Sequence, residues 1–528
     1  MNRSSLVLAA ALLAVGSTLS AQVHQVHRVS LEDAIRLADR SSESIDIARA
    51  AVTRANGQQA IARSQFLPQL NAAASYNRTL ASQFEGFTFG GPDTNTFRSL
   101  CAPNIPDTAT PAERQAALDQ ARTCASGGGG ADFSSVGFGA LNQWSLGLQF
   151  SQNIFTGGRA TGQRVAANAG RRAADIELTA QRAQNILDVT QAYYNTVLAS
   201  RLAEIAEAAL SMSDDVLRQT SRARQVGSSS EFDLLRAQVA RDNQVPIVLQ
   251  RRSDRTVAML RLKQMLEIPL DDSLQLTTSI DEAPAPIVSG VSDTGRVVSD
   301  TSADARAAVR EALENVNAQE GLLRASRADR LPTLALVSSY QRLFFPTSTF
   351  PELNDYRENW TIGFSAGVSL LSGGRIRGGQ MLAEANLREA RARLKQAREL
   401  AALDSRIALA QLAQAEATWR ASQGTAEQAR RAYGIDQIRY REGISTQTEL
   451  TQSQLLVEQA MVNRAVAARD LAVARMRLAL LKDLPLSAAG AAPGGMNPAM
   501  GTSVPVMPAP QQPRTTTGAS AGPTGSNQ

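Results

Sequence analysis

The amino-acid sequence repeats itself at a constant offset of 216 in residue number. The motifs Gly157-Gly158-Arg159, Gly227, Asp233, Gln238 and Pro269 recur as Gly373-Gly374-Arg375, Gly443, Glu449, Gln454 and Pro485. A second set upstream, Gly57, Leu67-Pro68 and Tyr76, recurs as Gly321, Leu331-Pro332 and Tyr340 at an offset of 264. A repeat of this length indicates a duplicated structural unit. The two offsets differ by 48, which places an insertion in the first copy between about residues 79 and 142.

The duplication divides the chain into two structural repeats, residues 22–290 and 291–486. Residues 1–21 combine a basic Arg3 with an apolar run from Leu6 to Val15 and small residues after it, which predicts a signal peptide cleaved near Ser20 or Ala21. Residues 487–528 are rich in proline and glycine and carry a single charged side chain, Arg514. That composition predicts a disordered tail.

Composition and motifs argue against several classes of function. The net charge of +5 arises from 54 basic and 49 acidic residues interleaved along the chain, which is not the pattern of a nucleic-acid partner. The two histidines, His24 and His27, have no third ligand near them in the sequence, so no metal site is predicted. The glycines of residues 373–379 lack the lysine of a phosphate-binding loop. No nucleophile motif is present, and we expect neither an enzyme nor a cofactor.

Four segments alternate apolar and polar residues with the period of a β-strand: residues 70–76 and 144–151, and their repeats at 332–341 and 360–369. No apolar stretch after residue 21 is long enough for a membrane helix. A continuous apolar face on the strands therefore favours a transmembrane β-barrel. The alternative is a soluble β-sandwich.

Four strands are too few to close a barrel, because even small barrels need about eight. A barrel built from this chain must therefore be shared between several copies. Aromatic residues recur at matching places in the strands and are predicted to form a belt at the membrane interface: Tyr76, Trp144, Tyr340 and Trp360.

Each repeat also predicts one very long helix. The chain has no proline between Pro111 and Pro246, or between Pro351 and Pro485. Helices of about 67 residues, roughly 100 Å long, fit residues 158–224 and 374–440. A shorter helix is expected from Leu31 to about Ser64, ended by Pro68.

Each long helix ends at a glycine and returns as a second helix. Gly227 and Gly443 are predicted as the hairpin turns, and the hydroxyl groups of residues 229–230 and 445–446 as N-caps of the returning helices. Pro246 is predicted to kink or interrupt the first returning helix.

The insertion of the first repeat holds both cysteines of the chain. Cys101 and Cys124 lie within residues 80–141. In an exported protein two such cysteines are expected to form a disulfide, the alternative being two free thiols. If the strands span a membrane, this segment is an extracellular loop, which either covers part of the pore mouth or is an ordinary surface loop.

The duplicated order of helix, Leu-Pro-x-Leu, strand, loop, strand, Gly-Gly-Arg, very long helix, glycine turn and returning helix resembles the outer membrane factor family, the TolC-like efflux channels. The resemblance covers about residues 30–486 and includes Ser151-Gln152-Asn153-Ile154-Phe155 before the first Gly-Gly-Arg. It implies an α+β membrane protein in which three chains give four strands each to a 12-stranded barrel in the outer membrane of a Gram-negative bacterium. The helical hairpins would form a tunnel in the periplasm.

The resemblance also implies a function and partners. Such a homotrimer is the passive exit duct of a tripartite efflux pump or a type I secretion system. Its partners are a periplasmic adaptor (membrane fusion) protein, an inner-membrane transporter and the lipid of the outer membrane, and it needs no cofactor. The alternative from another class is a structural or adhesive coiled coil that spans the periplasm without a pore.

Relatives of this family close the tunnel at its periplasmic tip with acidic residues on the returning helices. Here Asp233 and Glu449 occupy the sixth position after the two turn glycines, and three copies would bring six carboxylates into one ring that attracts cations. Tyr440, three positions before Gly443, matches a tyrosine that holds the closed state. The alternative is that both acids are only helix N-terminal charges stabilised by the helix dipole.

The sequence departs from those relatives in two places. The arginine found in some of them at the second position after the second glycine is Ser445 here, and their second acidic position is Gln452. Arg236 and Arg441 are candidates to hold the closed state instead.

Overall fold

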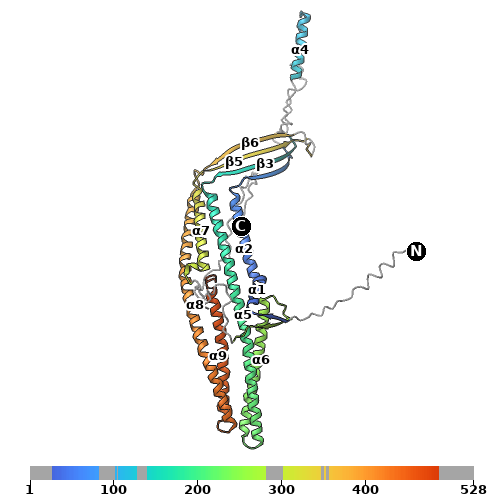
Figure 1. Ribbon diagram of the computed structural model, residues 1–528. Coiled ribbons are helices and arrows are strands. Elements are labelled where there is room, and N and C mark those ends of the chain that lie inside the picture. The colour runs from blue at the N-terminus through green and yellow to red at the C-terminus, as the bar shows by residue number, and fades with distance from the viewer. Residues whose placement is uncertain are drawn as a thin grey trace, which may run out of the picture. The chain divides into compact units, whose positions relative to one another are not determined.

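A computed structural model of the chain describes residues 26–81, 102–103, 105–127, 140–280, 301–346, 350–351 and 356–486. The predicted signal peptide, the predicted disordered tail and Cys101 lie outside these residues. The described part confirms the duplicated arrangement of long helices and antiparallel strands (Figure 1).

Four strands form one antiparallel sheet in the order β2 (Gln69–Arg78), β3 (Asn142–Phe155), β5 (Thr333–Phe344) and β6 (Arg357–Gly367). These are the four strands predicted from the alternating pattern. Because β3 and β5 pair in the middle, the two repeats are joined within the sheet. The strands β2 and β6 lie at its two edges.

The register of the sheet gathers apolar side chains on one face. Leu70 lies opposite Phe150, and Leu336 lies opposite Phe364. The other face is more polar and includes the pair Ser75 and Ser145, whose hydroxyl groups are 2.7 Å apart. The alternation read from the sequence therefore gives the sheet one mainly apolar and one more polar face.

The two long helices have the predicted length. Helix α5 (Arg159–Gln225) and helix α8 (Arg375–Arg441) each contain 67 residues. Each begins after a glycine with positive φ, 94° at Gly158 and 87° at Gly374, a conformation that other residues adopt only with strain. The sheet lies beyond the beginning of these helices, and the turns to the returning helices lie at their other end (Figure 1).

The returning helices are α6 (Glu231–Met265) and α9 (Gln447–Leu480). Pro246 was predicted to kink or interrupt the first of them, and the interruption does not occur, because α6 runs through this residue. A proline removes one backbone hydrogen bond from a helix interior. Packing of α6 along α5 compensates for that loss, and the side chains of Gln244 and Val248 on either side of the proline are buried.

Two shorter helices of 22 residues, α2 (Glu43–Ser64) and α7 (Ala307–Ala328), pack against α5 from the first and second repeat. The helix expected from Leu31 to Ser64 is divided, because Ser42 adopts an extended conformation between α1 (Leu31–Ser41) and α2. None of the described helices contains an apolar stretch long enough to cross a membrane.

Four further elements were not predicted. Strands β1 (Val26–Val29) and β4 (Ser273–Leu276) form a parallel pair beside α1. The insertion contains helix α4 (Pro111–Gly127), and a short 3-10 helix, η2 (Ala303–Ala305), precedes α7.

The largest apolar core joins α1, β1 and β4 to α5, α6, α8 and α9, and its buried aromatic residues are Tyr193, Tyr194 and Trp419. The Tyr193 hydroxyl donates to the carbonyl oxygen of Val29 at 3.1 Å, which fixes the short parallel sheet on α5.

A buried ion pair connects the ends of the second repeat. Arg306, at the start of α7, is fully buried, and its Nη2 lies 2.7 Å from Oδ2 of Asp404 in α8. Nη2 of Arg477 in α9 lies 3.0 Å from the other carboxylate oxygen. The backbone N–H of Ala307 donates to the carbonyl oxygen of Lys482 at 2.8 Å. The beginning of α7 and the end of α9 are thereby held together on α8.

Candidate functional site

The tips of the two helical hairpins have the same backbone design. Turns of equal length connect α5 to α6 and α8 to α9. Gly227 has a φ of 76° and Gly443 a φ of 73°. The following residues, Ser228 and Ile444, each donate a backbone hydrogen bond to the carbonyl oxygen five positions earlier. Both turns are therefore Schellman motifs, in which a left-handed glycine satisfies the last carbonyl groups of a helix.

Each returning helix begins with a capping box. The Ser230 hydroxyl accepts the backbone N–H of Asp233 at 3.1 Å, and Oδ2 of Asp233 accepts the backbone N–H of Ser230 at 3.2 Å. Thr446 and Glu449 make the same reciprocal pair, both at 3.3 Å. The two acids of the predicted gate thus satisfy N–H groups that have no partner in the helix itself. This is the helix-terminal role that the sequence offered as the alternative.

Hydrogen bonding keeps Asp233 ionised. Hydrogen bonds from the hydroxyl and the backbone N–H of Ser230 lower the pKa of the Asp233 carboxyl below its ordinary value. A hydrogen bond from the Ser229 hydroxyl and the charge of Arg236 add to this effect. The carboxylate is partly exposed at the tip, so it remains a charge that water and ions can reach.

Two predicted gate residues connect one hairpin to the other within the chain. The Tyr440 hydroxyl in α8 lies 3.0 Å from Oγ1 of Thr220 in α5. Nη1 of Arg236 in α6 donates to Oγ1 of Thr448 in α9 at 2.6 Å. The partners Thr220 and Thr448 were not predicted. No sequence signal marks them, because helix packing alone brings together residues from different repeats.

An apolar cluster, which we call the tip cluster, lies beneath these hydrogen bonds. It draws residues from all four helices: Val216, Leu217, Ala237, Tyr433, Tyr440 and Leu450. Further from the tip, the amide of Gln454 donates to the carbonyl oxygen of Ala209 at 2.9 Å and to the Ser213 hydroxyl at 2.8 Å. The recurrence of Gln238 as Gln454 at the offset of 216 is the sequence feature that marks this residue.

The remaining gate candidates lie on the surface. Gln452 and Arg441 are exposed in α9 and at the end of α8. Burial and then the charge of Asp215 raise the pKa of Tyr433 in the tip cluster, and Arg441 partly opposes this rise. The hairpin tips therefore join Tyr440 and Arg236 to the opposite hairpin, whereas the two acids bind the N-caps of their own helices.

The four aromatic residues of the strands lie in two cross-strand pairs. Tyr76 is opposite Trp144 with ring centroids 4.8 Å apart, and Tyr340 is opposite Trp360 at 6.3 Å. All four belong to the apolar face of the sheet. Cys124 of the insertion is disulfide-bonded, while its predicted partner Cys101 is outside the described residues.

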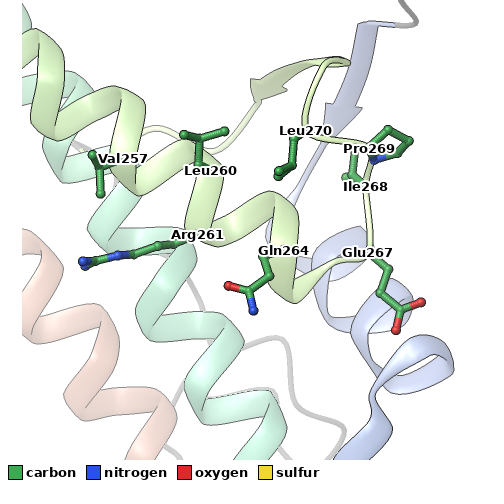
Figure 2. Close-up of a pocket in the computed structure, with 8 residues that line it drawn as sticks. All are labelled: Val257, Leu260, Arg261, Gln264, Glu267, Ile268, Pro269 and Leu270. Atoms are coloured by element: carbon green, nitrogen blue, oxygen red, sulfur yellow. The ribbon is translucent and has the colours of Figure 1, made fainter.

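A groove lies where α6 ends and the chain turns toward β4. Figure 2 shows Leu260, Ile268, Pro269 and Leu270 around it, with Arg261 extending away from them. Its lining is mostly apolar and holds no cluster of titratable groups. Across the described part of the chain, no group of three or more His, Cys, Asp and Glu side chains could hold a metal ion. His27, which was weighed as a ligand, lies 3.2 Å from Asp272.

Comparison with known structures places the fold among outer-membrane channels. The CmeC outer membrane channel of Campylobacter jejuni is 18% identical, with a TM-score of 0.61 over 87% of this chain and 86% of that one. The MtrE outer membrane channel of Neisseria gonorrhoeae, in its open state, is 17% identical, with a TM-score of 0.64 over 87% and 89%.

The outer membrane protein VceC of Vibrio cholerae is 16% identical, with a TM-score of 0.61 over 87% of this chain and 97% of that one. A comparison with curated protein sequences gives no significant match. At these identities the structures establish a shared fold. The family model for outer membrane efflux proteins matches residues 112–266 and 298–482, which cover well over half of the chain and both repeats. The chain belongs to the outer membrane efflux protein family.

Proposed function

We propose that three copies of this chain form a passive exit channel in the outer membrane of a Gram-negative bacterium, with the helical hairpins in the periplasm. The observation that carries this proposal is a four-stranded sheet with one apolar face and two edges, β2 and β6, that pair with no other described strand. A sheet in lipid must close on itself, because its edge N–H and C=O groups find no other partner there. Three copies would supply a barrel of 12 strands.

The chain's partners in this proposal are a periplasmic adaptor protein and an inner-membrane transporter, in a tripartite efflux pump or a type I secretion system. A passive duct needs such partners, since it supplies no energy for transport. We also propose that Tyr76, Trp144, Tyr340 and Trp360 lie at a membrane interface, and that Cys101 and Cys124 are joined across the external insertion.

The gate is proposed at the hairpin tips. The bonds from Tyr440 to Thr220 and from Arg236 to Thr448 hold neighbouring hairpins together, which keeps the tunnel narrow. The carboxylates of Asp233 and Glu449, fixed by their capping boxes, supply a ring of negative charge that favours cations in the constriction.

Planar-bilayer recording of the purified protein tests this proposal. We expect a small, cation-selective conductance that grows when Asp233 and Glu449 are both replaced by alanine. Because alanine also removes the capping boxes, the pair Asp233→Asn and Glu449→Gln separates the effects, since both amides still accept the cap hydrogen bond. This second variant should lose cation selectivity while the helix ends stay intact.

Each outcome has a distinct meaning. Unchanged selectivity in both double variants would remove the gate assignment and leave the channel in place. A protein that inserts into bilayers without any conductance would instead support a structural, non-conducting role.

A further inference from the structure

The offsets in residue number that relate the two repeats also relate their helices and their strand pairs in the structure. Helices α2 and α7 have equal lengths and are related by the offset of 264, while α5 and α8 have equal lengths and are related by the offset of 216. The sheet follows the same offsets. The observed pair Gln69 and Ser151 becomes, after shifting each residue by its own offset, the observed pair Thr333 and Gly367.

A contact that the first repeat makes with the second repeat therefore has an equivalent, in which a second repeat contacts the first repeat of another copy. One chain cannot make that counterpart, because its helix α2 lies on the other side of α5 from α7 and α8 (Figure 1). A second copy of the chain can make it, with its own α2 against α8. Contacts observed between α5 and α7 thus predict contacts between α8 and the α2 of the next copy.

The α5–α7 contact contains a close crossing of two glycines. A Cβ atom built on Gly162 would lie 2.5 Å from the carbonyl oxygen of Gly321, and one built on Gly321 would lie 2.6 Å from that of Gly162. Both glycines are buried. Neither position accepts a side chain, because the two backbones approach too closely.

The offsets map this crossing onto two other glycines. Gly162 corresponds to Gly378 in α8, and Gly321 corresponds to Gly57 in α2. Both counterparts are exposed, and a Cβ atom built on either meets no described atom within 4 Å. An exposed glycine inside a helix costs roughly 0.5–1 kcal/mol relative to alanine, and nothing in the described part of the single chain requires it at either place.

Each of the two exposed glycines has a large apolar side chain one helical turn further along its helix. The internal crossing is flanked by Ala325 and Ala166, whose backbone atoms approach the built Cβ atoms to 2.7 Å. The same offsets give Ile61 and Leu382 as their counterparts, and these are 68% and 65% exposed. A large apolar side chain left open beside a glycine, on both α2 and α8, favours surfaces that another helix covers.

We propose that Gly378 of one copy packs against Gly57 of the next copy, and that Ile61 and Leu382 become buried on either side of this crossing. The inference rests on the proposed self-association and goes beyond it by fixing the helices and their register. The occupant is a second copy of this chain, because the two halves of the crossing are both present on it. The sheet follows: the observed pair Leu148 and Tyr340 maps to Phe364 of β6 opposite Tyr76 of the next copy's β2.

Crosslinking in membranes tests the predicted neighbours. The full chain carries Ile61→Cys and Leu382→Cys in a background with Cys101→Ser and Cys124→Ser, and is treated with a short bismaleimide. We expect covalent dimers and trimers on denaturing gels, and monomers from either single-cysteine variant. The matched control replaces Ile47 in place of Ile61. It is equally exposed on α2 but about 21 Å further along the helix, so this pair should not crosslink.

Substitution of the glycines gives a second, independent test. Gly378→Leu should abolish the trimer in a chain that keeps its helix content by circular dichroism. Gly170→Leu, at another helical glycine with open space around it, should leave the trimer intact. Gly162→Leu should disrupt the fold of the chain itself.

The two proposals fail in different ways. A trimer that conducts ions but gives no crosslink between positions 61 and 382, or that tolerates Gly378→Leu, would overturn this inference and leave the channel function standing. A chain that neither associates nor conducts would remove the function itself.

Discussion

Removing the carboxylate of Asp404 should loosen the end of the second repeat more than any surface substitution. Asp404 holds two arginines, with Arg306 Nη2 at 2.7 Å and Arg477 Nη2 at 3.0 Å. Arg306 is fully buried, and its Nε and Nη1 atoms have no hydrogen-bond partner among the described residues. In Asp404→Ala the guanidinium of Arg306 would remain buried without its counter-ion. Breaking a buried pair in this way costs about 3–5 kcal/mol.

Hydrogen exchange of the assembled protein measures this loss locally. A cost of about 3 kcal/mol corresponds to a fall of roughly 100-fold in the protection of backbone amides, since 1.4 kcal/mol is a factor of ten. The fall should be confined to amides of α8 near residue 404, the beginning of α7 and the end of α9, which the two ion pairs of Asp404 hold together.

The first repeat supplies a matched control for this experiment. Asp188 corresponds to Asp404, but it is hydrogen-bonded to Gln184 at 2.8 Å, and burial raises the pKa of its carboxyl. In the first repeat, Ser42 stands at the position equivalent to Arg306, and the exposed Arg261 at the position equivalent to Arg477. Asp188→Ala should therefore change protection little. Equal losses in the two variants, or a loss below tenfold at Asp404, would refute the reasoning.

Three further predictions follow from individual residues. Burial, and to a smaller extent the charge of Glu177, raises the pKa of Glu311 from an ordinary 4.5 to about 7. The contribution of Glu311 to the stability of the fold is therefore complete below pH 4.5 and is lost as the pH rises through 7. Denaturation across this window should show a loss of stability on the order of 3 kcal/mol that Glu311→Gln abolishes. Gly227→Ala forces a left-handed alanine and should destabilise the hairpin tip by about 1–2 kcal/mol, measured by exchange at the tip, whereas Gly170→Ala in a helix interior should not. Tyr440→Phe removes the hydroxyl that meets Thr220, and should raise the frequency of opening in single-channel records without changing selectivity.

The elements with strong local signals were predictable from sequence. The long helices were placed to within about one residue, because each lies between glycines that adopt positive φ, Gly158 and Gly227 in the first repeat. The strands were predictable because a period of two is distinct from a helical period. The short pair β1 and β4 was not, since such short strands carry too little periodicity and their pairing joins segments from opposite ends of the first repeat.

Contacts between helices were the least predictable part of the candidate site. Nothing in the local sequence marks Thr220 as the partner of Tyr440, or Arg306 as the partner of Asp404. The interruption predicted at Pro246 does not occur for the same reason: the local rule counts one lost hydrogen bond, whereas α6 also packs against α5. Spacing determines which elements exist, whereas packing determines which of their side chains meet.

The two interpretations of Asp233 and Glu449 are compatible once the geometry is considered. All the hydrogen bonds from Ser229 and Ser230 to Asp233 reach Oδ2, and the bond from Thr446 to Glu449 reaches Oε2. One oxygen of each carboxylate is therefore bound to the cap, which restricts the side chain to a narrow range of rotamers while the group stays charged. A mobile carboxylate would spread its charge over several positions, but a capped one holds it at a fixed place on a helix end. In the proposed trimer, capping would hold the negative charges of the gate at fixed places around the tunnel.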